Sequence, residues 1–508
     1  MTDSRTDDTI YDLAVIGGGI NGCGIAADAA GRGLRVLLIE RDDLACGTSS
    51  ASSKLIHGGL RYLEQYAFRL VRESLEEREV LLANAPHIVW PLRFLVPHVP
   101  HMRSRIMIRA GLFLYDHLAK RRRIASSSLV DMARDPAARP LSAEFRSGFS
   151  YWDCWVDDAR LVVSVALQAA RHGAHIKTRT ALRRASIAEG RWLLEIDSGG
   201  QSTKAAAHML VNAAGPWAGA LAHTAIHRGG TTSEVAVRLV KGSHIVVPRI
   251  EGAECAYLLQ ADDRRVVFLL PFADRFTLIG TTDVPFDGDP ATAAISAAEA
   301  DYLLHVANAF LASPLQHADI VWSYAGVRPL YDDASENPSA VTRDYKLALE
   351  VSADAPPLLT VVGGKVTTYR RLAQSALEAL APFAGAALGP DWTANAALPG
   401  GDMPDGDFDA FLRALQSQHP TLPADLLRQL GRRYGTRARL VIGDAKSIGD
   451  LGADLGGGLS EREVVYLRDH EWARQPEDVL WRRTKAGLGM ASQEMASVQA
   501  RIARVLGS

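Results

Sequence analysis

The sequence has few cysteines, no CxxC pair and no excess of either charge. Its four cysteines (Cys23, Cys46, Cys154 and Cys255) lie far apart, which argues against a disulfide scaffold, a zinc ribbon or a cysteine-ligated iron–sulfur cluster and fits a reducing compartment. The 508 residues include 56 Lys and Arg against 58 Asp and Glu, a net charge of -2, so the overall charge gives no support for binding nucleic acid. A hydrophobic fraction of 47% provides for a large core, and the length suggests roughly two to four domains.

Long apolar runs are missing as well. The first residues, MTDSRTDDTIYD, are acidic and polar, without the basic start and apolar run of a secretory signal. No charge-free apolar run reaches the roughly 18 residues that a membrane span requires. We therefore expect no bilayer-spanning segment, although a protein that lies on a membrane surface stays possible.

From about residue 11 to 389, β-like apolar runs alternate with helical patterns, as in a mixed α/β protein. The later strands cluster as in an antiparallel sheet. The predicted strands are Leu13–Ile16, Val36–Ile39, Trp192–Ile196, Met209–Asn212, His244–Val247, Val266–Leu270, Phe276–Ile279 and Leu358–Val362.

A stretch rich in Gly, Pro and Asp predicts a domain boundary near residues 385–408. Beyond it, the pattern predicts a small helical domain. Its helices are expected at Phe408–Gln418, Ala424–Tyr434, Glu461–His470, Pro476–Lys485 and Ser492–Leu506, with Ser460 and Glu463 as a capping box.

A strand, a glycine-rich turn and a helix open the sequence. After the apolar run Tyr11–Ile16, Gly17, Gly19 and Gly22 form the pattern G-x-G-x-x-G, followed by a helical run and a second strand that ends at Glu40. Such glycines allow a tight turn and close approach of the backbone to a pyrophosphate at a helix N-terminus. An acid at the position of Glu40 can hydrogen-bond a ribose hydroxyl. These features together predict a dinucleotide site.

The residues after the second strand favour a flavin over a nicotinamide cofactor. Residues 47–54 are GTSSASSK and residues 55–62 are LIHGGLRY. Small hydroxyl and glycine residues let the backbone approach a flat ring system, whereas an NAD site usually continues with further parallel βα units.

These blocks resemble FAD-dependent glycerol-3-phosphate dehydrogenases, the aerobic respiratory family. The resemblance begins with YDLAVIGGGINGCGIAADAAGRGLRVLLIERDDLACGTSSASSKLIHGGLRYLE, in which Gly47 stands where alanine is expected. It continues at DCWVDDARL (Asp153–Leu161), LVNAAGPWA (Leu210–Ala218), RLVKGSHIVVPR (Arg238–Arg249), IGTTDV (Ile279–Val284), YAGVRPL (Tyr324–Leu330), TRDY (Thr342–Tyr345), GGKVTTYR (Gly363–Arg370) and DVLWRRTK (Asp478–Lys485). It covers essentially the whole chain.

The resemblance implies an α/β fold of the amino-acid-oxidase-like flavoprotein type: a Rossmann-type FAD domain, an antiparallel-sheet substrate domain and a C-terminal helical domain. The first two would be interleaved in residues 1–389, and residues 390–508 would form the helical cap. FAD segments are expected at about 10–90, 155–235 and 320–389, and substrate or membrane-facing segments at about 91–154 and 236–319. The implied reaction oxidises sn-glycerol 3-phosphate to dihydroxyacetone phosphate, with electrons passing through FAD to ubiquinone.

The motifs and the resemblance together give the candidate FAD contacts. They are Gly17, Gly19, Asn21, Gly22, Glu40, Thr48, Ser49, Ser50, Ser53, Lys54, Leu55, His57, Ala214, Gly215, Gly326, Gly364, Lys365, Val366 and Thr367. Gly326 and Gly364 are expected in turns. Lys365, or a helix that begins near Thr367, would stabilise a reduced anionic flavin.

A phosphate-bearing substrate favours arginine, whose planar fork donates paired charge-assisted hydrogen bonds. By resemblance, Arg61, Arg328 and Arg343 face the substrate pocket. Tyr62 and Thr281 are weaker candidates for contacts with substrate hydroxyls.

Oxidation of an alcohol also requires a general base. His244, Lys365 and His57 are alternatives that the sequence does not separate, and Arg328 joins them as a catalytic candidate. We predict no metal, because Arg474 occupies the second histidine position of H-E-x-x-H after His470.

Residues 93–123 contain a single acid, Asp116, and eight basic residues: Arg93, Arg103, Arg105, Arg109, Lys120, Arg121, Arg122 and Arg123. On a helical projection, basic residues gather on one side, Ile106, Met107, Ala110, Phe113 and Leu114 lie on the neighbouring side, and Leu112 falls among the polar residues. Such a helix can lie in the headgroup plane of an anionic bilayer. Quinone is lipid-soluble, so we expect a peripheral protein on the cytoplasmic side of the inner membrane. Separately, we expect a homo-oligomer (a dimer).

Three alternatives stay open. One is a soluble flavin oxidase that uses oxygen, and it shares most of the site. Another is an amine or amino-acid oxidase, which binds a carboxylate and an amine and needs no set of three arginines. The third is a catalytically silent, membrane-bound flavoprotein that acts as an interaction module.

Overall fold

The apolar run ahead of the glycine-rich turn forms β1 (Thr6–Ile16), an interior strand of the first of two large sheets. The computed structural model describes residues 6–64, 66–228, 237–331, 344–385 and 388–507. β1 pairs in parallel with β2 (Val36–Ile39) and β10 (Gln201–Asn212), and β10 pairs in parallel with β18 (Ala355–Gly363). The carboxyl ends of these four strands therefore meet at one edge of the sheet.

The order of this sheet is β17-β18-β10-β1-β2-β7; β9 pairs with β10, and β8 pairs with β9. Side chains of β1 alternate between its two faces. Leu13 and Val15 join a core with the helices α1 (Ile20–Gly31), α4 (Asp158–Arg171) and α7 (Tyr369–Leu380), while Ala14 joins a core on the other face. The remaining elements are β7 (His175–Lys177), β8 (Thr180–Ala188), β9 (Arg191–Ser198), α5 (Ala218–Thr224) and β17 (Tyr345–Ser352).

The second sheet is mainly antiparallel, as the clustering of the later strands predicts, and has the order β15-β11-β14-β13-β12-β4-β6-β3. β16 pairs with β11, and β5 pairs with β6. Its strands are β3 (Leu55–Ile56), β4 (Val89–Pro97), β5 (Ser128–Asp131), β6 (Ser147–Val156), β11 (Val237–Pro248), β12 (Ala256–Gln260), β13 (Val266–Phe272), β14 (Phe276–Gly280), β15 (Val284–Pro285) and β16 (Trp322–Tyr331).

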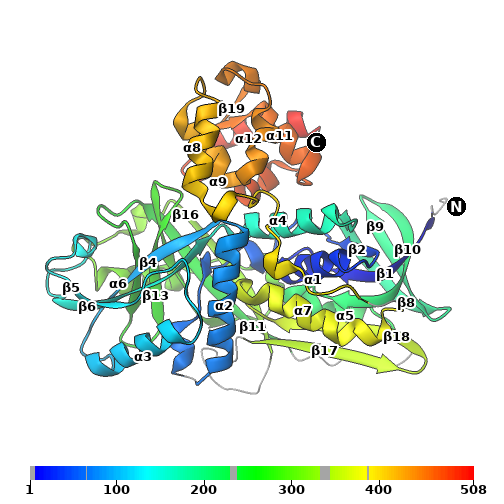
Figure 1. Cartoon of the computed structure of the whole chain (residues 1–508), viewed down its shortest axis with the longest axis horizontal. Helices are drawn as coiled ribbons and strands as arrows, with labels where there is room; N and C mark the ends of the chain where they lie inside the picture. Colours follow the sequence, from blue (N-terminus) through cyan, green and yellow to red (C-terminus); the bar gives the residue numbers. More distant parts are fainter. Residues whose placement is uncertain (1–5, 65, 229–236, 332–343, 386–387, 508) are drawn as a thin grey trace.

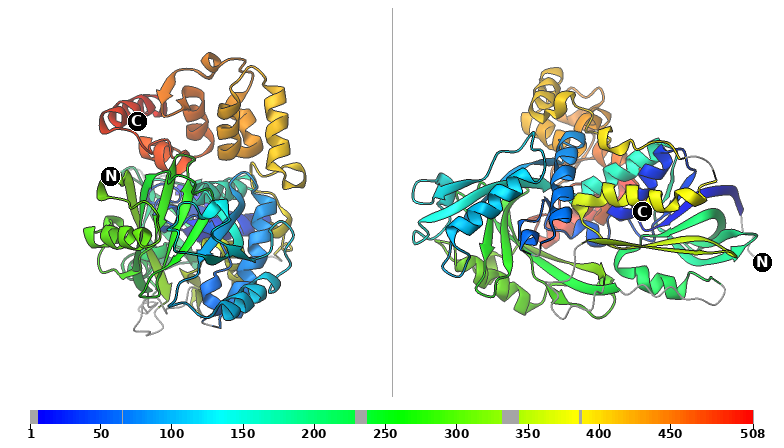
Figure 2. Two further views of the ribbon diagram at one scale, coloured as in Figure 1. Left: turned by 90° about the vertical axis from the view of Figure 1, so that its left-hand side faces the viewer. Right: turned by 60° about the horizontal axis from the view of Figure 1, so that its bottom comes forward.

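Helices cover both faces of the second sheet (Figures 1 and 2). α6 (Ala297–Asn308) packs Leu303 and Ala307 into one core. α2 (Phe68–Asn84) and α3 (Arg105–His117) pack against the opposite face, where Leu75 and Leu112 belong to one buried cluster. Among the described residues, no helix has the length and apolar character needed to cross a bilayer.

The C-terminal helices stand above the junction of the two sheets in Figure 1 and have a hydrophobic cluster of their own. They are α8 (Phe408–Gln418), α9 (Ala424–Tyr434), α10 (Ala438–Ile442), α11 (Glu461–His470) and α12 (Ser492–Leu506). The helix predicted at Pro476–Lys485 is a π-helix over Asp478–Arg483. Ser460 caps α11 at the N–H of Glu463, but the carboxylate of Glu463 accepts from Arg433 and Tyr434, so the capping box is only half formed.

Candidate active site

A cavity of about 840 Å³ lies where the two sheets meet. Its wall on the side of the first sheet comes from the loops at the carboxyl ends of β1, β2, β10 and β18. Its opposite wall includes Tyr151, Phe268 and Arg328 of the second sheet. The cavity therefore occupies the strand-end crevice where open α/β sheets bind ligands.

The glycine-rich turn forms one end of this cavity. Gly17 has a φ of 117°, and a Cβ on Gly22 would lie 1.9 Å from the Gly17 carbonyl oxygen, so both positions exclude any side chain. The turn leads into α1, whose N-cap is Gly19, a residue without a side chain to satisfy the first N–H groups. This end therefore presents backbone donors and a helix N-terminus to an anionic group.

Glu40 lies beside this turn at the end of β2. Its two oxygens accept the N–H groups of Gly18, at 2.7 Å, and Asp42, at 2.8 Å. Burial raises the pKa of Glu40, and the two backbone hydrogen bonds oppose that shift. Each carboxylate oxygen has a second lone pair, so Glu40 can still accept a hydrogen bond from a ribose hydroxyl.

The segment 47–55 forms the middle of the cavity wall. Ser49 accepts the N–H of Ile20 at 3.0 Å, and Thr48 donates to the carbonyl of Val327 at 2.5 Å. The buried Oδ1 atom of Asn21 has no partner among the described residues. An unsatisfied polar atom, a glycine cradle and a helix N-terminus together fit an FAD held along residues 17–21, 40 and 48–53.

Arg328 lines the cavity from the side of the second sheet. It lies on β16, donates to Thr281 Oγ1 at 3.0 Å and forms an ion pair with Asp283. A Cβ on Gly242 of the neighbouring β11 would lie 2.2 Å from Arg328 Nη2, so this glycine makes room for the guanidinium. Arg61 lines the same cavity. Two arginines that reach one cavity can hold a phosphate dianion.

Lys365 and His57 also line the cavity. The Lys365 ammonium lies 4.7 Å above the ring of Tyr62 and donates to Ser74 Oγ at 3.2 Å. Burial lowers the pKa of Lys365. Burial and the nearby lysine charge lower the pKa of His57 to about 3, which keeps its imidazole neutral at physiological pH.

His244 is placed differently from the other two base candidates. It is buried on β11, its Nε2 lies 2.9 Å from Ser53 Oγ, and its ring stacks on Tyr324 at 4.7 Å. It is not among the described residues that line the cavity. Burial, Arg328 and Lys54 lower its pKa well below the usual value. His244 therefore contacts Ser53, a residue of the cavity wall, from the side that faces away from the cavity.

Most of the candidate residues do line the cavity, with a few exceptions among those the structure describes. Gly22 does not line the cavity but packs against the Gly17 carbonyl of the turn. Lys54 does not line it either, because it is buried with its ammonium 2.8 Å from the Asp158 carboxylate. Gly326 lines the cavity but lies within β16, opposite Gly242, and so not in the turn that the sequence suggests. Arg343 lies outside the described residues.

The structure adds site residues that the sequence does not single out. Asp283 pairs with Arg328, Ser74 accepts from Lys365, and Arg41, the residue after Glu40, stacks over Trp217 at 4.3 Å. Residues 281–283 belong to a block that the resemblance includes, but nothing in the sequence marks Asp283 as the partner of Arg328. Within the described residues, no group of three His, Cys, Asp or Glu side chains could hold a metal ion.

A glycine cradle, a helix N-terminus and a cavity that continues to a cationic pocket define a flavoprotein oxidoreductase of the amino-acid-oxidase-like fold. Comparison with known families gives the same result in more detail. Residues 12–370 match the model of FAD dependent oxidoreductases, and residues 392–508 match the C-terminal domain of alpha-glycerophosphate oxidase. The chain belongs to the FAD dependent oxidoreductase family, and FAD is its cofactor.

Individual proteins resemble the chain over almost its full length. A glycerol-3-phosphate dehydrogenase of Pseudomonas aeruginosa is 54% identical over 486 residues, 96% of this chain and 93% of that protein. A D-erythritol 1-phosphate dehydrogenase of Brucella abortus is 47% identical over 488 residues, 96% of both chains. The crystal structure of a Bacillus halodurans glycerol-3-phosphate dehydrogenase complexed with FAD aligns with a TM-score of 0.74 at 26% identity, covering 99% of this chain and 95% of the other.

Proposed function

We propose that this protein oxidises sn-glycerol 3-phosphate to dihydroxyacetone phosphate and passes the electrons through FAD to ubiquinone in a membrane. The observation that carries the proposal is that Arg61 and Arg328 line the same cavity as the glycine-rich turn. Two guanidinium groups suit a phosphate dianion. The relative named glycerol-3-phosphate dehydrogenase supports the same substrate.

The arrangement assigns a separate task to each group of side chains. Arg61 and Arg328 bind the phosphate, and Thr281, oriented by its hydrogen bond to Arg328, contacts a substrate hydroxyl. When bound, FAD supplies the acceptor for the hydride that leaves C2. The hydroxyl proton leaves in the same reaction, so the alcohol loses one hydride and one proton as the ketone forms.

Lys365 is the base that we favour for this proton. It lines the cavity, and its lowered pKa increases the fraction of neutral amine that can accept a proton. His57 is a weaker base because of its low pKa, and His244 is behind the cavity wall. We expect Lys365→Met to reduce kcat far more than His244→Asn, and equal losses would contradict this assignment.

Anaerobic flavin reduction tests the substrate. Purified protein loaded with FAD is mixed with sn-glycerol 3-phosphate, and the flavin absorbance near roughly 450 nm is followed. Rapid bleaching supports the proposal, and its absence would overturn it. D-Erythritol 1-phosphate serves as the second substrate, because the Brucella relative is named for it. Faster bleaching by D-erythritol 1-phosphate would identify this longer polyol phosphate as the substrate instead.

The electron acceptor requires its own experiment, because the match to an oxidase C-terminal domain favours oxygen as a second candidate. The reaction is run in air with and without a soluble ubiquinone analogue. We expect quinone reduction to exceed hydrogen peroxide formation. Stoichiometric peroxide with no effect of quinone would identify an oxidase.

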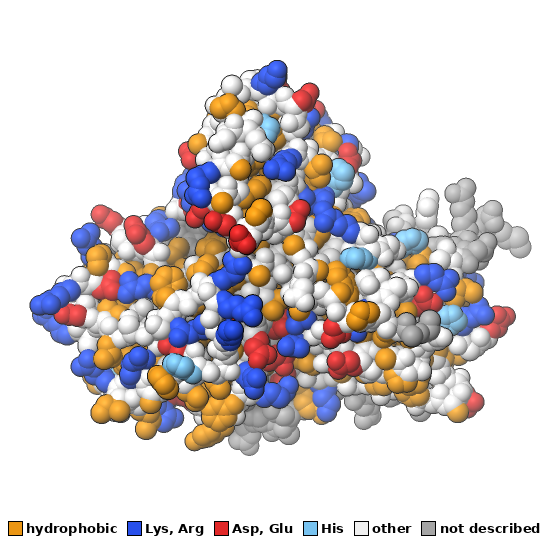
Figure 3. Space-filling view, viewed as in Figure 1, with side chains coloured by type: hydrophobic (Ala, Val, Ile, Leu, Met, Phe, Trp, Pro, Cys, Tyr) orange, Lys and Arg blue, Asp and Glu red, His pale blue; other side chains and the backbone are white. Residues whose placement is uncertain are grey.

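The proposed membrane surface centres on α3. Its core side carries Leu112 and Tyr115, at 1% and 2% exposed, while Ile106 and Phe113 on its outer side are 84% and 57% exposed. The outer side also exposes Met107 and Leu114. In Figure 3, hydrophobic and basic side chains gather along the lower edge, where Figure 1 shows α3. An apolar face beside basic residues suits an anionic bilayer.

Two further observations define this surface. Arg103, just before α3, forms an ion pair with Glu64, and the neighbouring Tyr66 and Phe68 are exposed, so the apolar surface extends to the start of α2. Arg93, by contrast, lies on β4 and not on α3 or the residues that flank it, so we exclude it from the basic set.

Vesicle binding tests the membrane surface. We expect Ile106→Glu with Phe113→Glu to abolish sedimentation with phosphatidylglycerol vesicles. The matched control is Ile448→Glu, which changes an apolar residue between α10 and α11 that is 58% exposed, about as much as Phe113. A second variant replaces with Glu the basic residues Arg105, Arg109 and Arg121–Arg123. It should also bind these vesicles more weakly at low salt. Unchanged sedimentation of both variants would contradict the proposal.

A further inference from the structure

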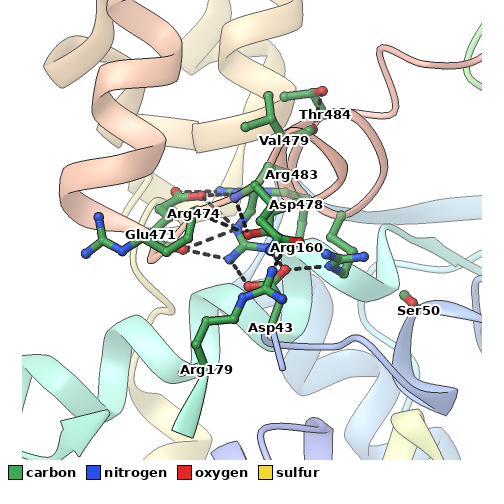
Figure 4. A network of polar contacts seen from close by, with 12 residues as sticks. Asp43, Ser50, Arg160, Arg179, Glu471, Arg474, Asp478, Val479, Arg483 and Thr484 are labelled. Carbon is green, nitrogen blue, oxygen red and sulfur yellow. Dashed lines mark hydrogen bonds and ion pairs between the residues drawn. The ribbon is translucent and has the colours of Figure 1, made fainter. Parts of the chain in front are cut away.

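Buried ion pairs join the C-terminal helices to the cofactor end of the cavity (Figure 4). Arg483, which is fully buried, donates from both terminal nitrogens to the carboxylate of Asp43, at 2.8 Å each. Arg482 donates to the same carboxylate. Asp43 is three residues beyond Glu40. The C-terminal helices therefore hold the chain just after the candidate ribose contact.

The loop that contains Asp43 (residues 40–47) folds back onto the glycine-rich turn. The N–H of Ala45 donates to the carbonyl of Gly18 at 3.1 Å, and the Gly18 N–H donates to Glu40 at 2.7 Å. Immediately after this loop, Ser49 accepts the N–H of Ile20 at the start of α1. A displacement of Asp43 would therefore disturb the hydrogen bonds of both Gly18 and Ile20 in the turn that leads into α1.

The same C-terminal segment (residues 478–489) also contacts two residues outside the lining of the cavity, Asp157 and Trp322. Lys485 lies 3.6 Å from the carboxylate of Asp157, the N-cap of α4, and the adjacent Asp158 accepts from Lys54 and from Ser52. Trp481 stacks on Trp322 of the second sheet, with 4.9 Å between ring centroids. The segment thus contacts residues that support the cavity from two directions.

The ion pairs of Arg483 belong to a larger buried network that also includes Glu471 and Arg160. Arg483 Nη2 also donates to the Glu471 carbonyl at 2.7 Å, and Arg160 of α4 donates to the Glu471 carboxylate at 3.0 Å. Burial disfavours charge on Asp43, but the charges of Arg483 and Arg482 lower its pKa and keep it ionised. Fully desolvated ion pairs add little net stability compared with apolar packing. One use of such pairs is to fix how two segments of a protein are positioned relative to each other.

We propose that the segment 478–489 positions the FAD-binding loop 40–47 through Arg483 and Asp43, so that tight FAD binding depends on the C-terminal helices. Neither Asp43 nor Arg483 is among the described residues that line the cavity, so both are positioning residues that act through Glu40 and Ser49. By linkage, FAD binding must stabilise the contact of the segment with the loop by the same factor.

Titration of the apoprotein with FAD tests this proposal, read as quenching of flavin fluorescence. We expect Asp43→Asn to raise the Kd for FAD at least tenfold, while kcat and KM at saturating FAD change less than twofold. The matched control is Glu463→Gln, which removes a buried carboxylate that accepts from Arg433 and Tyr434 inside the C-terminal helices. Its Kd should stay within twofold of the wild type. An equal Kd for Asp43→Asn and the wild type would overturn the proposal.

Hydrogen exchange on the wild-type protein provides a test that needs no variant to fold. Amide exchange is compared between apoprotein and FAD-loaded protein by mass spectrometry. We expect FAD to slow exchange at least tenfold both in the loop 40–47 and in the segment 478–489. Slowed exchange in the loop with no change in the segment would overturn the proposal.

Discussion

The two ends of the active-site cavity are built from different parts of the chain. The cofactor end is centred on a local turn, in which Gly17, Gly22 and the start of α1 present backbone groups within a few residues. The proposed substrate end is assembled from distant segments, because Arg328 lies on β16 and Thr281, its hydrogen-bond partner, directly follows β14. Backbone recognition depends on the absence of side chains, whereas side-chain recognition depends on strand register. The two ends should therefore respond differently to substitution.

The largest effect is expected at the cofactor end, from Gly22→Ala. The added Cβ would lie 1.9 Å from the Gly17 carbonyl oxygen, so the turn must change shape. We expect FAD affinity to fall by more than about 100-fold, a loss of about 3 kcal/mol, and the protein to purify without its yellow colour. Gly111→Ala in α3 is the control, because its Cβ would meet nothing within 4 Å. Normal flavin content in Gly22→Ala would show that the cradle is not the binding site.

Arg328→Ala tests the substrate end and should leave the cofactor end intact. Hydrogen bonds to charged groups contribute about 1.5–3 kcal/mol, so we expect KM for the phosphate substrate to rise roughly 10- to 100-fold. The flavin content and absorbance spectrum should not change. Steady-state kinetics with equilibrium dialysis of FAD measure both effects. A loss of FAD together with the rise in KM would mean that the two ends are not independent.

The contrast between local turns and long-range side-chain contacts also explains how much could be predicted from the sequence. The cofactor end follows from local spacing, and the predicted bounds of α8, α9, α11 and α12 agree with the structure because each helix has a strong periodic pattern. The place of His244 could not be predicted, because a single histidine on an apolar strand carries no signal of which neighbour it meets. Its contact with Ser53, 191 residues away in the sequence, is set by the tertiary fold.

α3 shows a second limit of the sequence. Its projection contains two apolar groups, one with Leu112 and Tyr115 and one with Ile106 and Phe113, and periodicity cannot say which packs against the protein. The pairing of Asp43 with Arg483 is beyond local pattern altogether, since the partners are separated by 440 residues. Long-range contacts of this kind carry no spacing rule in a single sequence.

Glu299→Gln should moderately change how stability depends on pH, because Glu299 is a buried carboxylate bonded to Thr282, next to Thr281 of the proposed substrate end. Glu299 of α6 accepts from Ser243 and Thr282, each at 2.8 Å, and pairs with Lys241. Burial opposes its charge, but these partners lower the pKa of Glu299 to about 2.

A lowered pKa means that the stabilising contribution of Glu299 is complete above its unfolded value of about 4.5 and is lost as the pH falls towards 2. We expect the wild type to lose roughly 1–2 kcal/mol more unfolding free energy than Glu299→Gln between pH 6 and pH 3. Urea unfolding at both pH values measures the difference, and parallel losses would contradict it.

The smallest expected effect separates two roles of Tyr62, whose ring lies under the Lys365 ammonium at 4.7 Å. Tyr62→Phe keeps the ring and removes only the hydroxyl, so we expect KM to rise by roughly three- to tenfold with no change in the pH profile of kcat. Tyr62→Leu also removes the ring, which favours the charged amine by about 0.5–1 kcal/mol. Its loss should lower the pKa of Lys365 further and move the acid limb of kcat down by about half a pH unit. A shift in both variants, or in neither, would show that the ring does not tune Lys365.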